Sequence, residues 1–232
     1  MANDIVASDQ TILEPFRISD DRLEMKDSLQ ESLRIILTRV QKSGEIPSRI
    51  VLTSALHGEV VTSISLALAM TLASDFQAKV GLIDLNWYSA AKWFLDREKT
   101  MGVIDILDGG IPFKNALQVT GLTNLSILPA GELEPIRRPM IARGKALRDL
   151  ILKLEKQFDH LVLDVPAILS TSDAVPLASL GEGCILVLQQ GATPTAEVRQ
   201  ALSEISHLPL LGIVLNQVRY STPGFLISLL EQ

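Results

Sequence analysis

Three features that would each assign a class of protein are scarce or missing in this sequence. There is one cysteine, Cys184, so no disulfide can form within the chain, and a reducing cytoplasm is indicated. Lysine and arginine number 21 against 27 acidic residues, and a net charge of −6 argues against nucleic acid as a partner. No apolar run reaches the roughly 18 residues that span a bilayer, so direct membrane insertion is not expected.

The N-terminal stretch MANDIVASDQTILEPFRISDD also lacks the layout of a secretory signal, because it is acidic and has no basic-then-apolar order. We therefore expect a cytoplasmic protein, which a partner could recruit to the inner face of the cell membrane. Residues 1–25 show no sustained hydrophobic period and are expected to form a flexible arm. Residues 26–232 are expected to form a single α/β domain, since 47% of the chain is hydrophobic and supplies one core.

Strands and helices alternate along the expected domain. The six apolar runs are nearly continuous rather than alternating, as in strands covered on both faces: RIVLTSA, VGLIDL, LSILPA, HLVLDVP, CILVLQQ and LLGIVLNQV. Helical spacing occurs over residues 26–42, 62–76, 141–158 and 193–207, the last with Thr193 as a cap and Pro194 in its first turn. This order predicts a doubly wound, mostly parallel sheet flanked by helices.

The end of the first strand, SALHGEVVTS, has the position of a phosphate-binding loop but not its usual residues. Such a loop uses glycine for close backbone approach, a lysine for phosphate and a hydroxyl for Mg²⁺. With Thr62 as the hydroxyl, Val61 occupies the lysine position and Val60 the glycine before it. A β-branched residue resists positive φ, so we expect Val60 to open the loop, and we expect the two valines to pack as an apolar loop.

Two more strands end in carboxylates, Asp84 in VGLIDLNWY and Asp164 in HLVLDVPAI. A carboxylate at the carboxyl end of a parallel strand faces the side of the sheet where ligands bind, and Asp164 has the setting of an Mg²⁺-holding aspartate. An aspartate after a strand also caps helices or closes turns, and the sequence leaves both roles open.

Together these segments resemble the bacterial tyrosine kinase (BY-kinase) family, also known from capsular exopolysaccharide systems, within the ParA/MinD-type P-loop group. Family members read approximately T-S-x-x-P-G-E-G-K-S-T, then D-x-D-x-R, then D-x-P-P after successive strands. The matching residues here are Thr53, Ser54, Gly58, Glu59, Thr62, Ser63, Asp84, Asp164 and Pro166. The resemblance, which covers roughly Glu31 to Val218, implies a P-loop NTPase-like fold.

The departures from the family pattern lie at the chemistry. Besides Val60 and Val61, the second aspartate of the second motif is Asn86, its arginine is replaced by Trp87 or Tyr88, and Ala167 replaces a proline. The tyrosine-rich tail is absent, and the family's oligomerisation motif E-x-x-R-x-x-R survives as Glu31 and Arg34. The resemblance therefore implies no catalytic residue and a vestigial nucleotide site made of Gly58, Glu59, Val60, Val61, Thr62, Ser63, Asp84, Asp164 and Asn216. Asn216 has two expected roles, one near the adenine and one as a turn residue at the end of a strand.

The resemblance implies a catalytically inactive regulatory or scaffolding subunit in exopolysaccharide or capsule biosynthesis and export. Its expected partner is the cytoplasmic segment of a membrane polysaccharide co-polymerase of the chain-length regulator type, with self-association as a further possibility and no cofactor. The alternative is an active tyrosine autokinase or ATPase that binds ATP and Mg²⁺ through Thr62, Asp84 and Asp164. It would take a cation from Arg137 and Arg138, which are otherwise an anion or partner patch or a solvated basic turn.

A MinD-like role and a metal site at His57 are two further hypotheses. A MinD-like positioning protein fits poorly, because the C-terminal PGFLISLLEQ has no lysine or arginine for a membrane surface. His57 lies where a proline is usual, and with three histidines in the chain no metal-ligand cluster is indicated, so we expect a solvent-exposed loop residue.

Overall fold

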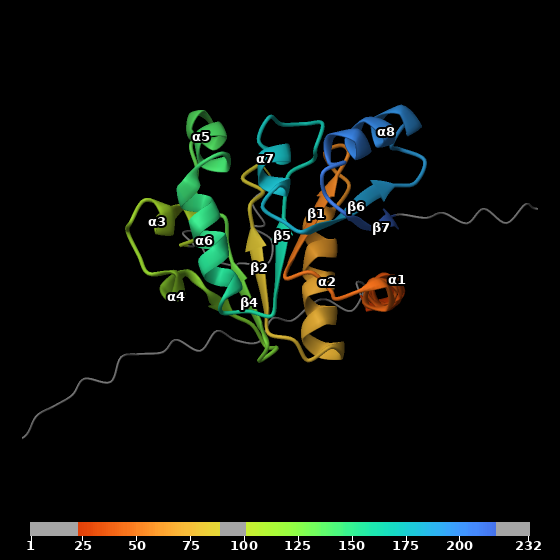
Figure 1. Ribbon diagram of the computed structural model, residues 1–232, viewed down its shortest axis with the longest axis horizontal. Helices are drawn as coiled ribbons and strands as arrows, with labels where there is room; N and C mark the ends of the chain where they lie inside the picture. Colours follow the sequence, from red (N-terminus) through yellow and green to blue (C-terminus); the bar gives the residue numbers. More distant parts are fainter. Residues whose placement is uncertain (1–22, 89–100, 217–232) are drawn as a thin grey trace, which may run out of the picture.

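A seven-stranded sheet lies at the centre of the computed structural model, which describes residues 23–88 and 101–216 (Figure 1). The strand order is β3-β4-β2-β5-β1-β6-β7, and every pair is parallel except β3 with β4. The strands are β1 (Arg49–Ser54), β2 (Val80–Asp84), β3 (Gln118–Val119), β4 (Leu125–Leu128), β5 (His160–Asp164), β6 (Gly183–Gln189) and β7 (Leu210–Asn216). Each of the six predicted runs forms a strand, and the short β3 is an addition that the pattern did not predict.

Helices cover both faces of the sheet (Figure 1). The long helices α1 (Leu23–Ser43) and α2 (Val61–Asp75) pack on one face. The other face is covered by α3 (Val103–Leu107), α4 (Phe113–Ala116), α5 (Arg138–Ala142), α6 (Lys145–Glu155), α7 (Ala174–Ala178) and α8 (Thr195–Glu204), with the short 3-10 turn η2 (Pro135–Arg137) before α5. No helix in the described parts of the chain is long and apolar enough to cross a membrane.

Both faces of the inner strands β1, β2, β5 and β6 are buried, which explains why their sequences do not alternate. The expectation of a strand covered on both faces is wrong for the edge strand β7, where Leu210, Ile213 and Leu215 are exposed. On β5, Val162 packs into the apolar cluster beneath α1 and α2, whereas Leu161 and Leu163 pack into the cluster on the other face. On β1, Leu52 and Val51 divide in the same way. Successive side chains of a strand point to opposite faces, so a strand covered twice needs apolar residues at every position.

The helix boundaries differ from the sequence prediction at two places. The stretch predicted as one helix over 141–158 is broken after Ala142, and α6 begins after Gly144, where a Cβ would lie 3.1 Å from the carbonyl oxygens of Met140 and Ile141. The prediction that Thr193 caps α8 is wrong, because Pro194 is the N-cap and forms no side-chain cap bond. Residues 1–22 of the predicted arm, and the tail from residue 217, lie outside the described residues.

Candidate functional site

The loop between β1 and α2 keeps a conformation suited to glycine even though valine stands there. Gly58 has φ 90°, and Val60 has φ 62° and ψ 35°, in the left-handed region. The expectation that Val60 opens the loop is therefore wrong. A β-branched residue in this region is strained by about 1–2 kcal/mol, and such strain persists only when surrounding contacts hold the backbone in place.

The side chain of Glu59 supplies such contacts. It is 3% exposed, and its Oε2 accepts a hydrogen bond from the backbone N–H of Leu56 at 3.0 Å. Its Oε1 accepts from the backbone N–H of Gln189 at 3.2 Å and from the hydroxyl of Thr193. One buried carboxylate thus ties the loop after β1 to the end of β6 and fixes the backbone next to Val60.

The two valines of the loop have different surroundings. Val61, the first residue of α2, is 7% exposed and belongs to the apolar cluster beneath α1 and α2. Val60 is 42% exposed, so the expectation of a packed apolar loop holds for Val61 and is wrong for Val60. His57 and Glu59 are the ionisable residues between Thr53 and Ser63, so this segment carries no lysine or arginine.

Asp84 and Asp164 end neighbouring strands in direct register. Both point to the face of α2, since Leu82 and Val162, two residues earlier on each strand, pack into that cluster. Asp84 Oδ1 accepts the backbone N–H of Asn86 at 2.8 Å, which realises the turn-closing role that the sequence left open. Asp164 is 1% exposed, and neither of its carboxylate oxygens has a hydrogen-bond partner among the described residues.

Burial raises the pKa of Asp164 well above its ordinary value, and the neighbouring Asp84 raises it further. The hydroxyls of Thr62 and Ser65, from the first turns of α2, lower this pKa in part. Neither hydroxyl makes a hydrogen bond of normal geometry to Asp164, since both carboxylate oxygens of Asp164 are buried without a hydrogen-bond partner. Burial and the neighbouring carboxylate thus both favour protonation of Asp164 relative to an exposed aspartate.

The family that the sequence resembles implies a nucleotide and Mg²⁺ at this edge of the sheet. The residues present fit the Mg²⁺ ion but do not fit the phosphates of the nucleotide. The unpartnered oxygens of Asp164, with Asp84 and the hydroxyl of Thr62, are the oxygen ligands that Mg²⁺ prefers. The phosphate side does not fit, because the lysine position holds the buried Val61.

The aromatic residues after β2 point in different directions. Trp87 is buried, and its Nε1 donates to the carbonyl oxygen of Ala130 at 3.4 Å. Tyr88 is partly exposed, and its hydroxyl donates to Asp173 at 2.7 Å. Burial, and then Asp173, raise the pKa of Tyr88, while Arg138 and Thr171 lower it. Asp173 was missed as a site residue, although it stands in the family-like segment SDA.

The predicted basic patch is divided between two surroundings. The guanidinium of Arg137 makes two hydrogen bonds to the carboxylate of Asp108, at 2.5 and 3.1 Å. The guanidinium carbon of Arg138 lies 4.3 Å from the centre of the Tyr88 ring. The structure therefore does not bring the two arginines together, and only Arg138 contacts a residue that follows a central strand.

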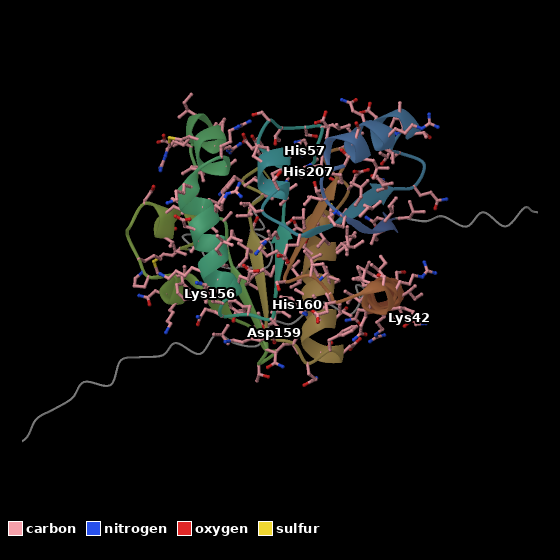
Figure 2. The ribbon with its side chains drawn as sticks, viewed as in Figure 1. Lys42, His57, Lys156, Asp159, His160 and His207 are labelled. Atoms are coloured by element: carbon pink, nitrogen blue, oxygen red, sulfur yellow. The ribbon has the colours of Figure 1, made fainter. Side chains whose placement is uncertain are left out.

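The other predicted residues lie farther apart. His57 is exposed, as expected, and Figure 2 shows it at the carboxyl ends of the strands, opposite His160 and Asp159. Asn216 ends β7 at the edge of the sheet, separated from β1 by β6. Arg34 on α1 bonds Asp75 of α2 at 2.5 Å and Glu31 at 3.4 Å, so the candidate oligomerisation residues are engaged within the chain. Within the described ranges, no group of three or more histidine, cysteine or acidic residues could hold a metal ion.

Comparison with known proteins places this geometry in a group. No family model matches the chain. The kinase domain of Escherichia coli tyrosine kinase ETK superposes with a TM-score of 0.78 at 20% identity, covering 93% of this chain and 87% of that one. The septum site-determining protein MinD of Pyrococcus horikoshii, solved with Mg-ADP, superposes with a TM-score of 0.59 at 20% identity, covering 78% and 76%. The chain thus shares the fold of these two proteins.

Sequence relatives narrow the assignment within that group. Tyrosine-protein kinase CpsD of Streptococcus pneumoniae is 27% identical over 208 residues, covering 88% of this chain and 91% of the relative. Tyrosine-protein kinase YwqD of Bacillus subtilis is 26% identical, covering 85% of each. The chain is thus similar in sequence, over most of its length, to these two tyrosine-protein kinases.

Proposed function

We propose that this chain is a catalytically inactive BY-kinase-like protein that serves as a regulatory or scaffolding subunit in bacterial exopolysaccharide or capsule biosynthesis and export. Its partner in this proposal is the cytoplasmic segment of a membrane polysaccharide co-polymerase, which recruits it to the inner face of the cell membrane. A polysaccharide role is supported by a relative from Rhizobium meliloti, the succinoglycan biosynthesis transport protein ExoP, which is 29% identical over 127 residues. That match covers 53% of this chain and 16% of ExoP.

The observation that carries the proposed loss of catalysis is the burial of Val61. Phosphoryl transfer on P-loop proteins depends on positioning and on cations that meet the charge of the phosphates. Val61 occupies the lysine position, and its aliphatic side chain is packed beneath α1 and α2. An exposed valine could leave room for a cation from elsewhere, whereas a buried one makes the start of α2 part of the apolar core.

Calorimetric titration with ATP and ADP, each with Mg²⁺, tests this proposal. We expect no binding to the wild type and binding to the double variant Val60→Gly/Val61→Lys, which restores the glycine and the cation. Adding Asp164→Asn to that double variant is expected to weaken the regained binding, because it removes one carboxylate ligand of Mg²⁺. Micromolar binding of ATP by the wild type would overturn the proposed loss of the nucleotide site.

The scaffolding half of the proposal needs a separate measurement. The purified chain is mixed with the cytoplasmic segment of a polysaccharide co-polymerase from the same organism, and the complex is sought by size-exclusion chromatography. An active bacterial tyrosine kinase with its own co-polymerase segment serves as the positive control. If the control forms a complex and this chain does not, the proposed partner is wrong even when nucleotide binding is absent.

A second candidate function is an ATP-binding autokinase or ATPase with a non-standard phosphate loop. Its support is the left-handed backbone at Val60, together with the unpartnered carboxylate of Asp164. The required cation would come from Arg138 or from a partner, since Arg137 already pairs with Asp108. Phosphate release from ATP is the measurement, and turnover that is unchanged in Asp164→Asn would exclude this candidate.

A further inference from the structure

A cluster of charged and aromatic side chains lies beside the candidate nucleotide site and is not explained by it. It joins residues that follow four different strands: His57 after β1, Tyr88 after β2, Arg138 after β4 and Asp173 after β5. The ring centres of His57 and Tyr88 are 6.2 Å apart. Because the carboxyl ends of parallel strands share one edge of the sheet, the cluster lies where such folds bind ligands.

Arg138 is the member of the cluster whose bonding is incomplete. Its guanidinium stacks over Tyr88, with 4.3 Å between the guanidinium carbon and the ring centre. Its Nε is buried without a hydrogen-bond partner, and it forms no ion pair with any residue in the described ranges. A stacked guanidinium keeps the donors in its plane available for the oxygens of an anion.

The acidic member of the cluster is already satisfied by other groups. Asp173 is fully buried and accepts hydrogen bonds from the hydroxyls of Tyr88 at 2.7 Å and Ser172 at 3.2 Å. Arg143 lies 3.7 Å from it and also donates to the backbone carbonyl of Ser172 at 2.8 Å. The charge of Asp173 is thus met by Arg143, and the charge of Arg138 remains for a ligand.

We propose that Arg138, held over Tyr88, anchors a binding site for a phosphate monoester, with His57 as a second donor. A guanidinium binds two oxygens of one anion, and a phosphate monoester offers a third oxygen that can accept a hydrogen bond from an imidazole N–H. This site does not use the lost lysine of the loop, and it does not depend on the proposed function. The same phosphate chemistry could be presented by a nucleotide or by a phosphotyrosine side chain of a partner.

Titration calorimetry of the full chain tests the site with phenyl phosphate as the probe. Phosphotyrosine and AMP, both phosphate monoesters, distinguish the two sources of phosphate, and benzoate tests a simple carboxylate. We expect Arg138→Gln to weaken phenyl phosphate binding about tenfold or more, as for a lost charge-assisted contact. Arg137→Gln, which removes the neighbouring and already paired charge, is expected to change binding less than about twofold.

Two variants of Tyr88 separate the stacking from a general loss of structure. Tyr88→Phe keeps the ring beneath Arg138 and is expected to retain binding, whereas Tyr88→Leu removes the ring and is expected to weaken it. Thermal unfolding of each variant shows whether the fold is intact. Absence of binding by every phosphate probe, or equal weakening by Arg137→Gln and Arg138→Gln, would overturn the proposal.

Discussion

Asp84 and Asp164 lie side by side in direct register on the adjacent parallel strands β2 and β5, and both side chains are buried. Burial disfavours the ionised form of Asp164, and a negative charge on the neighbouring Asp84 disfavours it further. In an Mg²⁺-binding relative, a bound cation would offset such repulsion. Here the lysine position is a buried valine, and the stability of the fold should report the titration of Asp164.

The unfolding free energy is expected to fall as pH rises because of Asp164. Its pKa is raised in the folded state above the ordinary value of 3.8, so the stabilisation is complete at low pH and is lost as pH rises toward the folded pKa. Each pH unit in this range removes at most about 1.4 kcal/mol. Asp164→Asn should lack this loss. In urea unfolding, the unfolding free energy of Asp164→Asn relative to the wild type should therefore increase as pH rises from about 4.

Asp84→Asn is the matched control for the Asp164 experiment. It removes the neighbouring charge but leaves burial in place, so it should lower the pKa of Asp164 and narrow the pH range of the loss. Parallel stability curves for the wild type and Asp164→Asn would contradict the prediction.

The fold could be predicted because its signals are local. Six continuous apolar runs separated by helical spacing are sufficient for a parallel sheet covered twice, and all six runs form strands. The exceptions also have local physical causes. A predicted helix breaks before Gly144, and the two-residue β3 is too short to leave a pattern in the sequence.

The site was only partly predictable because its decisive contacts are distant in sequence. Strand-end aspartates at 84 and 164 could be found from their setting, and their shared edge follows from a parallel sheet. The different surroundings of Arg137 and Arg138 could not be found, since they depend on Asp108 and Tyr88. The backbone at Val60 was predicted wrongly because the preference of a β-branched residue is local, whereas the contacts of Glu59 reach residues far along the chain.

Replacing each loop valine by glycine should change stability in opposite directions. Val60→Gly relieves a left-handed β-branched residue, and after the entropy of glycine in the unfolded chain we expect a gain of up to about 1 kcal/mol. Val61→Gly removes a buried side chain from the first turn of α2 and should cost about 2–4 kcal/mol. Urea unfolding measures both, and a loss of stability in Val60→Gly would show that the strain argument is wrong.

Cys184 should be inert in the folded protein. It is buried on β6, and this burial raises its pKa to about 12, so the reactive thiolate is almost absent at about pH 8. Iodoacetamide should leave the native chain unmodified and should add one group in concentrated guanidinium chloride, in keeping with the single cysteine. Mass spectrometry reads both states, and native labelling at the rate of a free thiol would contradict the burial.

Glu59 should be the residue that holds the loop in its strained form. In the wild type, the donors bond both carboxylate oxygens of Glu59, whereas Glu59→Gln leaves them one carbonyl oxygen. We expect the unfolding free energy measured in urea to fall by about 1–3 kcal/mol. Thr193→Val removes one of these donors, so its effect should couple with that of Glu59→Gln rather than add to it.

The pair Glu59 and Val60 gives a sharper test of the same idea. If Glu59 fixes the left-handed backbone, the loop of Glu59→Gln can relax, and Val60→Gly should then stabilise the protein less than it does in the wild type. Urea unfolding of the wild type, both single variants and the double variant gives this coupling. Strict additivity would mean that the backbone at Val60 is held by other contacts, and that Glu59 only joins the loop to β6.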